Sequence, residues 1–258
     1  MSILNAVPVF ILILVRISCF LATMPIFSYR TVPATVRIGL AVSLSLLVEV
    51  VLFKDQTLAT GGTFVLLVLK EALIGLTMGF AAGILTYGVQ FAGSLIDLQM
   101  GFALANVISP DNGSTAPLSG QLLFTLQMMF FLGVDAHHML ISGLLQSFTL
   151  FPLNRLAIQI ASGQTVEFVT KLTAQLFIIG LQLAIPLVGC LFLTDVAIGI
   201  VARTVPQVNV FVVGLPLKIM VGFVILIILF PAILVLFRVI FDSMTDAFGT
   251  FMQLLEAP

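Results

Sequence analysis

The chain has 258 residues, of which 60% are hydrophobic and only 8% are charged, whereas soluble domains average about 45 to 50% apolar and about 25% charged residues. So few charges cannot cover the surface of a globule this large, which excludes an ordinary soluble domain and predicts a surface that faces lipid or other protein. The net charge of -1 and the scattered Lys and Arg exclude a basic nucleic-acid-binding surface. The two cysteines, Cys19 and Cys190, lie inside apolar runs and are expected to be small core residues.

The hydropathy pattern predicts an all-α integral membrane protein built of helical hairpins. A spanning helix needs about 20 apolar residues. Uncharged intervals occur at 72–96, 112–134, 136–154, 172–194 and 219–237, and weaker apolar segments at about 6–27 and 38–53. Together they predict roughly six helical segments, some of them broken or tilted. The first stretch lacks a basic region before it and carries Arg16 in its middle, so we expect a retained membrane segment and not a signal peptide.

The third segment is too long for a simple span. Residues 64–96 would form a continuous helix of about 50 Å, and the hydrocarbon core is about 30 Å thick. The segment is therefore expected to tilt strongly, break or leave the bilayer. The chain also has no Trp and only two Tyr, so the interfacial aromatic belt of lipid-facing helices is nearly missing.

Several charged residues lie within or beside the apolar stretches, where a charge at a helix centre costs about 2.5 to 3.5 kcal/mol. Arg16 and Asp195 lie deepest and are predicted to be buried beside a partner. Asp195 and Arg203 are about 12 Å apart along one helix and cannot pair with each other. Lys70 and Arg238 can be paired or can reach an interface at a helix end.

Glu71 begins the sharpest local pattern, because Gly75, Gly79 and Gly83 follow it at intervals of four residues. This spacing places the three glycines near one helix face and permits the close approach of another helix backbone. The sequence leaves open whether that helix belongs to this chain or to a different subunit.

A segment rich in Pro, Gly, Ser and Thr separates two apolar stretches and cannot continue a helix. Because its flanks lie at membrane depth, its backbone must be buried in protein or line a cavity, which makes it a candidate gate; a plain surface loop is the alternative. The segment consists of Asn106, Val107, Ile108, Ser109, Pro110, Asp111, Asn112, Gly113, Ser114, Thr115, Ala116, Pro117, Leu118, Ser119 and Gly120.

Enzymatic functions find little support in the sequence. No Gly-rich phosphate-binding loop followed by Lys and Ser or Thr occurs, and no motif pairs a nucleophile with a base. His137 and His138 are adjacent, and adjacent helix positions point in different directions, which argues against a metal site. We therefore predict no catalytic residue, no cofactor and no metal.

These features resemble the R subunit of the flagellar type III export gate, the FliR family and its injectisome relatives. The resemblance covers nearly the whole chain, and its most specific part is the string RTVPQVNVFVVGLPLK, which is more similar to the flagellar branch. The matching residues are Arg16, Pro25, Phe27, Pro33, Arg37, Glu71, Gly75, Gly79, Asp97, Gln99, Gly101, Gly133, His138, Ser147, Pro152, Pro186, Asp195, Arg203, Pro206, Gln207, Asn209, Phe211, Gly214, Pro216 and Lys218.

The resemblance implies a non-enzymatic core component of a pore through which unfolded flagellar proteins cross the inner membrane at the basal body. Its implied partners are the gate subunits FliP and FliQ, the switch subunit FlhB and the export subunit FlhA. It also implies a P-like half at about 1–160 and a Q-like half at about 161–258. A secondary transporter or ion channel with its own midplane site is the alternative function, and a scaffold for assembly is a third.

The resemblance assigns roles to two groups of residues, and the residue pattern itself suggests a third. The segment 106–120 corresponds to a channel plug. From their positions in the apolar stretches, subunit packing or buried charge is expected for Arg16, Glu71, Gly75, Gly79, Gly83, Asp97, Asp195 and Arg203. A hairpin tip facing the cytosolic switch subunit corresponds to 203–218 and includes Pro206, Gln207, Asn209, Phe211, Gly214, Pro216 and Lys218.

Overall fold

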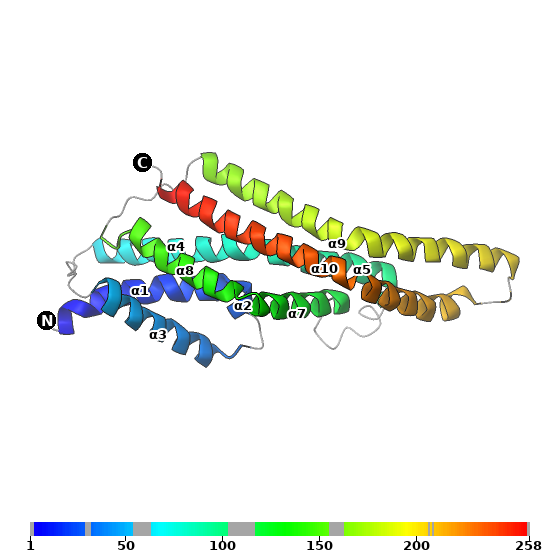
Figure 1. Ribbon diagram of the computed structural model, residues 1–258, viewed down its shortest axis with the longest axis horizontal. Coiled ribbons are helices and arrows are strands. Elements are labelled where there is room, and N and C mark those ends of the chain that lie inside the picture. Colours follow the sequence, from blue (N-terminus) through cyan, green and yellow to red (C-terminus); the bar gives the residue numbers. More distant parts are fainter. Residues whose placement is uncertain are drawn as a thin grey trace. The chain divides into compact units, whose positions relative to one another are not determined.

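A computed structural model describes residues 3–28, 32–53, 63–102, 117–154, 163–205, 207 and 209–256. Within these ranges every regular element is a helix and no strand occurs, which confirms the predicted all-α class (Figure 1). The helices gather in two compact units. Unit 1 comprises Met1–Ile84, Asp135–Leu172 and Asp242–Pro258, and unit 2 comprises Leu85–Val134 and Thr173–Phe241. Each unit combines segments from both predicted halves, and the P-like and Q-like division stays a prediction.

Unit 1 is organised around its first helix. It contains α1 (Ile3–Thr23), α2 (Pro25–Ser28), α3 (Ala34–Leu52), α4 (Thr63–Gly83) and α8 (Ala136–Leu150). Helix α1 packs against α3 and α4. Its fully buried Leu12, Ile13, Ile17 and Phe20 recur every three or four residues, the period that places side chains on one helix face. Arg16 lies on that same buried face.

Unit 2 contains most of the 3-10 turn η1 (Ile84–Thr86), α5 (Tyr87–Met100) and α7 (Leu118–Gly133). It also contains the adjoining parts of two long helices, α9 (Gly163–Thr204) and α10 (Val210–Glu256). Helices α5 and α7 pack against each other. A methyl group added at Gly93 of α5 would overlap the backbone of Gly120 in α7. Glycine at these two positions therefore permits the close contact of the two helices.

A 3-10 turn interrupts the overlong third segment, and a break was one of the three outcomes expected for it. Helix α4 ends at Gly83, a 3-10 turn η1 covers Ile84–Thr86, and α5 begins at Tyr87. The tighter winding of a 3-10 turn interrupts the regular α-helical hydrogen bonding.

The apolar helices agree with the roughly six segments predicted, some of them broken. Among the described residues, four helices are long and apolar enough to span a membrane, or five if the bent pair α7 and α8 counts as one span. Val7–Thr23 is a further, shorter apolar helix. The segment expected at about 6–27 is divided between α1, which ends at Thr23, and α2, which begins at Pro25.

Two boundaries and the burial of one cysteine also differ from the sequence prediction. Leu118, Ser119 and Gly120 belong to α7, because the helix begins directly after Pro117, a residue type well suited to a helix start. Most of the predicted hairpin tip at 203–218 is helical, because α9 ends at Thr204 and α10 begins at Val210. That this tip faces the cytosolic switch subunit stays a prediction. Cys190 is exposed on α9, so the expectation that it lies in the core is wrong.

Candidate functional site

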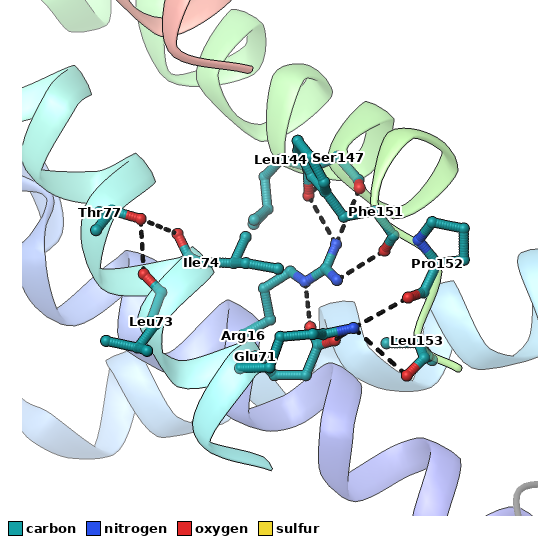
Figure 2. Close-up of polar contacts among 11 residues, drawn as sticks. Arg16, Glu71, Leu73, Ile74, Thr77, Leu144, Ser147, Phe151, Pro152 and Leu153 are labelled. Atoms are coloured by element: carbon teal, nitrogen blue, oxygen red, sulfur yellow. Dashed lines mark hydrogen bonds and ion pairs between the residues drawn. The ribbon is translucent and has the colours of Figure 1, made fainter. Parts of the chain in front are cut away.

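The most completely enclosed polar cluster lies in unit 1 and is centred on Arg16. Its side chain is fully buried, and its Nε–H donates to Glu71 Oε2 over 2.5 Å. Nη1 donates to the backbone oxygen and hydroxyl of Ser147 at 3.0 and 3.2 Å, and Nη2 donates to the Phe151 oxygen at 2.9 Å. The guanidinium also lies 4.2 Å from the centre of the Phe148 ring. Figure 2 shows Glu71, Ser147 and Phe151 converging on the guanidinium.

Glu71 joins the two cations of the cluster. Its carboxylate is fully buried and accepts from Arg16, and its Oε1 lies 2.6 Å from Nζ of Lys70. Lys70 Nζ also donates to the backbone oxygens of Pro152 and Leu153 at 3.0 and 3.4 Å. One carboxylate thus sits between two cations, and each cation completes its hydrogen bonding with backbone oxygens.

The backbone oxygens that accept these bonds lie at and beyond the C-terminal end of α8. The last carbonyl groups of a helix have no partner within the helix, and the negative end of the helix dipole favours a cation there. Helix α8 ends at Leu150, and Pro152 follows. The residues Arg16 and Lys70 therefore act as caps that α1 and α4 supply to α8.

The Arg16 cluster consequently acts as an internal anchor. Burial of Arg16 with a charged partner is confirmed, and Lys70 takes the paired alternative that the sequence left open. Arg16 and Glu71 have no exposed surface, so neither is positioned to bind a transported solute. We assign the cluster the role of holding three helices of unit 1 together.

The glycine face of α4 packs within the chain. A methyl group at Gly75 would overlap the Arg16 backbone oxygen, one at Gly79 would lie 2.7 Å from the Phe20 oxygen, and one at Gly83 would overlap the Pro25 ring. Of the two alternatives that the sequence left open, the structure shows packing inside this chain. The glycines bring α4 close enough to α1 for Glu71 to reach Arg16.

Asp97 forms a second buried contact, in unit 2. Its carboxylate, on α5, accepts from the backbone N–H of Ser119 at 3.0 and 3.3 Å. Ser119 lies in the first turn of α7, where free N–H groups and the helix dipole favour an anion. Asp97 is therefore a buried charge, as predicted, and its partner is the backbone N–H of Ser119 at the N-terminal end of α7.

A third polar group in unit 2 connects three helices. Gln99 Nε2, on α5, donates to Asp195 Oδ2 of α9 at 2.8 Å, and Lys218 of α10 forms an ion pair with Asp195 Oδ1. Asp195 is therefore paired as predicted, but its side chain is 36% exposed, so the expected burial is wrong for the isolated chain. A pair this exposed contributes little by itself.

Asp195→Asn is expected to lower the stability of the chain by about 1 kcal/mol or less, because the pair with Lys218 is partly solvated. The expected effect on assembly is larger if partner subunits cover the pair, because Lys218 would then be buried without its counter-ion. Thermal melts and the yield of the assembled complex measure the two effects. Glu167→Gln, which breaks the exposed Lys171–Glu167 pair, is the control. Normal assembly with abolished export would contradict a structural role for Asp195.

The remaining predicted site residues are dispersed or lie outside the described residues. Arg203 is exposed and forms no ion pair within the described ranges, and Gln207 and Asn209 are exposed. Gly214 is buried in α10, where Phe211 and the exposed Pro216 also lie. Pro206 and residues 106–116 of the predicted plug lie outside the described residues. Of the other charges in apolar segments, Glu49 is half-buried and Arg238 is exposed.

Sequence reasoning missed several partners. Ser147, Gln99 and Lys218 were noted as matching residues, but nothing in their spacing connects them to Arg16 or Asp195. Pro152 after an apolar stretch was an available signal for a helix end that needs a cationic cap.

His137 and His138 do not point away from each other as expected. Both occupy the first turn of α8, and their ring centres lie 4.1 Å apart.

Comparison with known proteins agrees with the resemblance found in the sequence. The family described as "Bacterial export proteins, family 1" matches residues 7–244. The chain is 42% identical over 254 residues to the flagellar biosynthetic protein FliR of Bacillus subtilis, which covers 98% of each chain. It is 34% identical over 236 residues to FliR of Pectobacterium carotovorum, with 90% of this chain and 89% of the relative covered. It is 30% identical over 210 residues to the Yop proteins translocation protein T of Yersinia pestis, with 80% of each chain covered. Both the family match and these identities extend over most of the chain, and the chain therefore belongs to the bacterial export proteins of family 1, the family of the flagellar FliR proteins.

Proposed function

We propose that the chain is a core, non-enzymatic component of the flagellar type III protein export gate in the bacterial inner membrane at the basal body. The observation that carries the proposal is the 42% identity that extends over 98% of both this chain and the B. subtilis FliR protein. The proposed partners are FliP and FliQ, with which the chain would form a channel for unfolded flagellar proteins, and the export components FlhB and FlhA.

The exposed apolar surface supports a role inside a membrane assembly. Large apolar side chains are exposed along all four of the helices that are long enough to span a membrane, for example Val51 of α3 at 71% and Ile227 of α10 at 70%. Such surfaces need lipid or partner subunits to cover them. The buried charges favour a structural over a transport role, because Arg16, Lys70 and Glu71 bind one another and backbone oxygens.

Co-expression with FliP and FliQ tests the proposal. The chain should co-purify with both in mild detergent, and its yield of folded protein should fall strongly when they are left out. A deletion strain should lose export of flagellar proteins, and export should return with the expressed chain. A chain that is equally stable alone or as a homo-oligomer, and that does not bind FliP or FliQ, would favour a self-contained transporter.

The predicted plug permits a sharper test. We propose that 106–120 seals the channel. Deleting Asp111 to Ser114 should leave assembly intact, because loop length changes closure entropy by only about 0.6 kcal/mol per doubling. The assembled gate should then conduct small ions and solutes, measured as conductance or as solute-dependent growth inhibition.

The control for this deletion removes Gln56 to Ala59, an equally long piece of the connection that the sequence predicts at 54–62. It should leave the membrane tight. A tight membrane with both deletions, in normally assembled gates, would return 106–120 to the status of an ordinary connection.

A further inference from the structure

Three metal-ligating side chains meet at the start of α8, in unit 1. Asp135 precedes the helix, and His137 and His138 occupy its first turn. One ligand atom from each of the three residues lies within 4.8 Å of the other two. These are the only two histidines of the chain, so both imidazoles are gathered at one point beside a carboxylate.

The local backbone explains why Asp135 lies beside the two histidines. Asp135 adopts a left-handed conformation with φ 56°, which is the only positive φ outside glycine within the described residues. Asp is one of the few residue types that tolerate this conformation. The turn places the Asp135 carboxylate back over the first turn of α8, where its Oδ1 lies 3.3 Å from Nδ1 of His138.

His137 supplies a second, independent observation. Its Nδ1 is shielded from solvent and has no hydrogen-bond partner among the described residues. A buried polar atom without a partner calls for an explanation, and an ion or ordered water that occupies the position is one of the established ones. The neighbouring Asp135 and His138 side chains are 73% and 70% exposed and can rotate toward such an ion.

We infer that Asp135, His137 and His138 bind a divalent transition-metal ion of the zinc class. Two imidazole nitrogens and one carboxylate oxygen form a ligand set that zinc prefers, and three protein ligands leave a fourth position for water. Ligands of a tetrahedral zinc ion lie about 3.4 Å apart when each bond is about 2.1 Å, so modest rotation of the exposed side chains closes the site. The positive end of α8 opposes a cation, and the Asp135 carboxylate offsets that repulsion.

The bound ion would stabilise the turn before α8. It would join the residue before the helix to two residues of its first turn. The Arg16 cluster caps the opposite end of the same helix, so α8 would be held at both ends. This inference concerns the chain's own residues and does not depend on the proposed export function.

The test is binding of Zn²⁺ and Co²⁺ to the full-length chain in whichever form purifies in mild detergent, with an affinity tag that contains no histidine. We expect one Zn²⁺ bound per chain by calorimetry, a higher melting temperature in its presence, and visible absorption bands of four-coordinate cobalt with Co²⁺. His137→Gln and His138→Gln should each lower zinc affinity by more than about tenfold. Loss of a residue that only hydrogen-bonds to a metal ligand already lowers metal affinity by about 10- to 100-fold.

Two carboxylate variants separate the site from general surface binding. Asp135→Asn keeps a residue that tolerates the left-handed turn and should also weaken zinc binding, whereas Asp246→Asn removes an exposed carboxylate of unit 1 and should leave it unchanged. Melting curves without metal confirm that each variant is folded. Absence of stoichiometric zinc binding, or unchanged binding by the folded His137→Gln/His138→Gln double variant, would overturn the inference.

Discussion

Glu71→Gln is expected to destabilise the chain by about 3 to 5 kcal/mol, the usual cost of removing one partner from a buried ion pair. The carboxylate is fully buried between Arg16 and Lys70, so the amide would leave two cations in an apolar interior without a counter-charge. A thermal melt in mild detergent measures the loss, and cells that carry the variant should assemble fewer gates.

The matched control is Glu49→Gln. Glu49 also lies on an apolar helix of unit 1, is half-buried, and forms no ion pair within the described ranges, so its replacement should change the melting temperature little. Adding Lys70→Met to Glu71→Gln should recover part of the lost stability, because one of the two uncompensated cations is then removed. Equal melting temperatures for the parent chain and Glu71→Gln would contradict the anchor role.

Gly79→Leu is expected to separate α4 from α1. A side chain at this position meets the Phe20 backbone oxygen and the Thr23 side chain, and overpacking typically costs about 1 to 3 kcal/mol. The cost should reach the upper part of that range, because backbone cannot move aside as a flexible side chain can. The shift would also draw Glu71 away from Arg16. We expect Gly79→Leu to impair the folding of the chain itself, so its melting temperature should fall both with and without co-expressed partners.

Gly39→Leu is the control for this substitution. Gly39 lies exposed on α3 of the same unit, and a Cβ atom added there meets nothing within 4 Å, so the folded chain should tolerate a leucine. If Gly79→Leu left the melting temperature unchanged and only reduced recovery of the assembled gate, the glycine face would instead contact a different subunit.

Composition and periodicity determined the fold class of this chain. The low charge content excluded a soluble domain, and the long apolar stretches predicted helices. The sequence also identified Arg16 as buried and paired, because an unpaired arginine at the centre of an apolar helix costs several kcal/mol in insertion free energy. From length alone, the third segment was expected to tilt, break or leave the bilayer, and a 3-10 turn interrupts it. These inferences succeed because they depend on properties that each segment has by itself.

Only the tertiary structure decided which groups meet. Arg16 is bound by Glu71, 55 residues later, and by Ser147, 131 residues later, and no local pattern encodes such distances. The glycine face of α4 suits any closely packed helix, so the choice of α1 depends on how the chain folds back on itself. The contact between Asp135 and His138 depends on one left-handed residue before α8. A period in the sequence defines a helix face, whereas the partner of that face is set by the packing of the other helices.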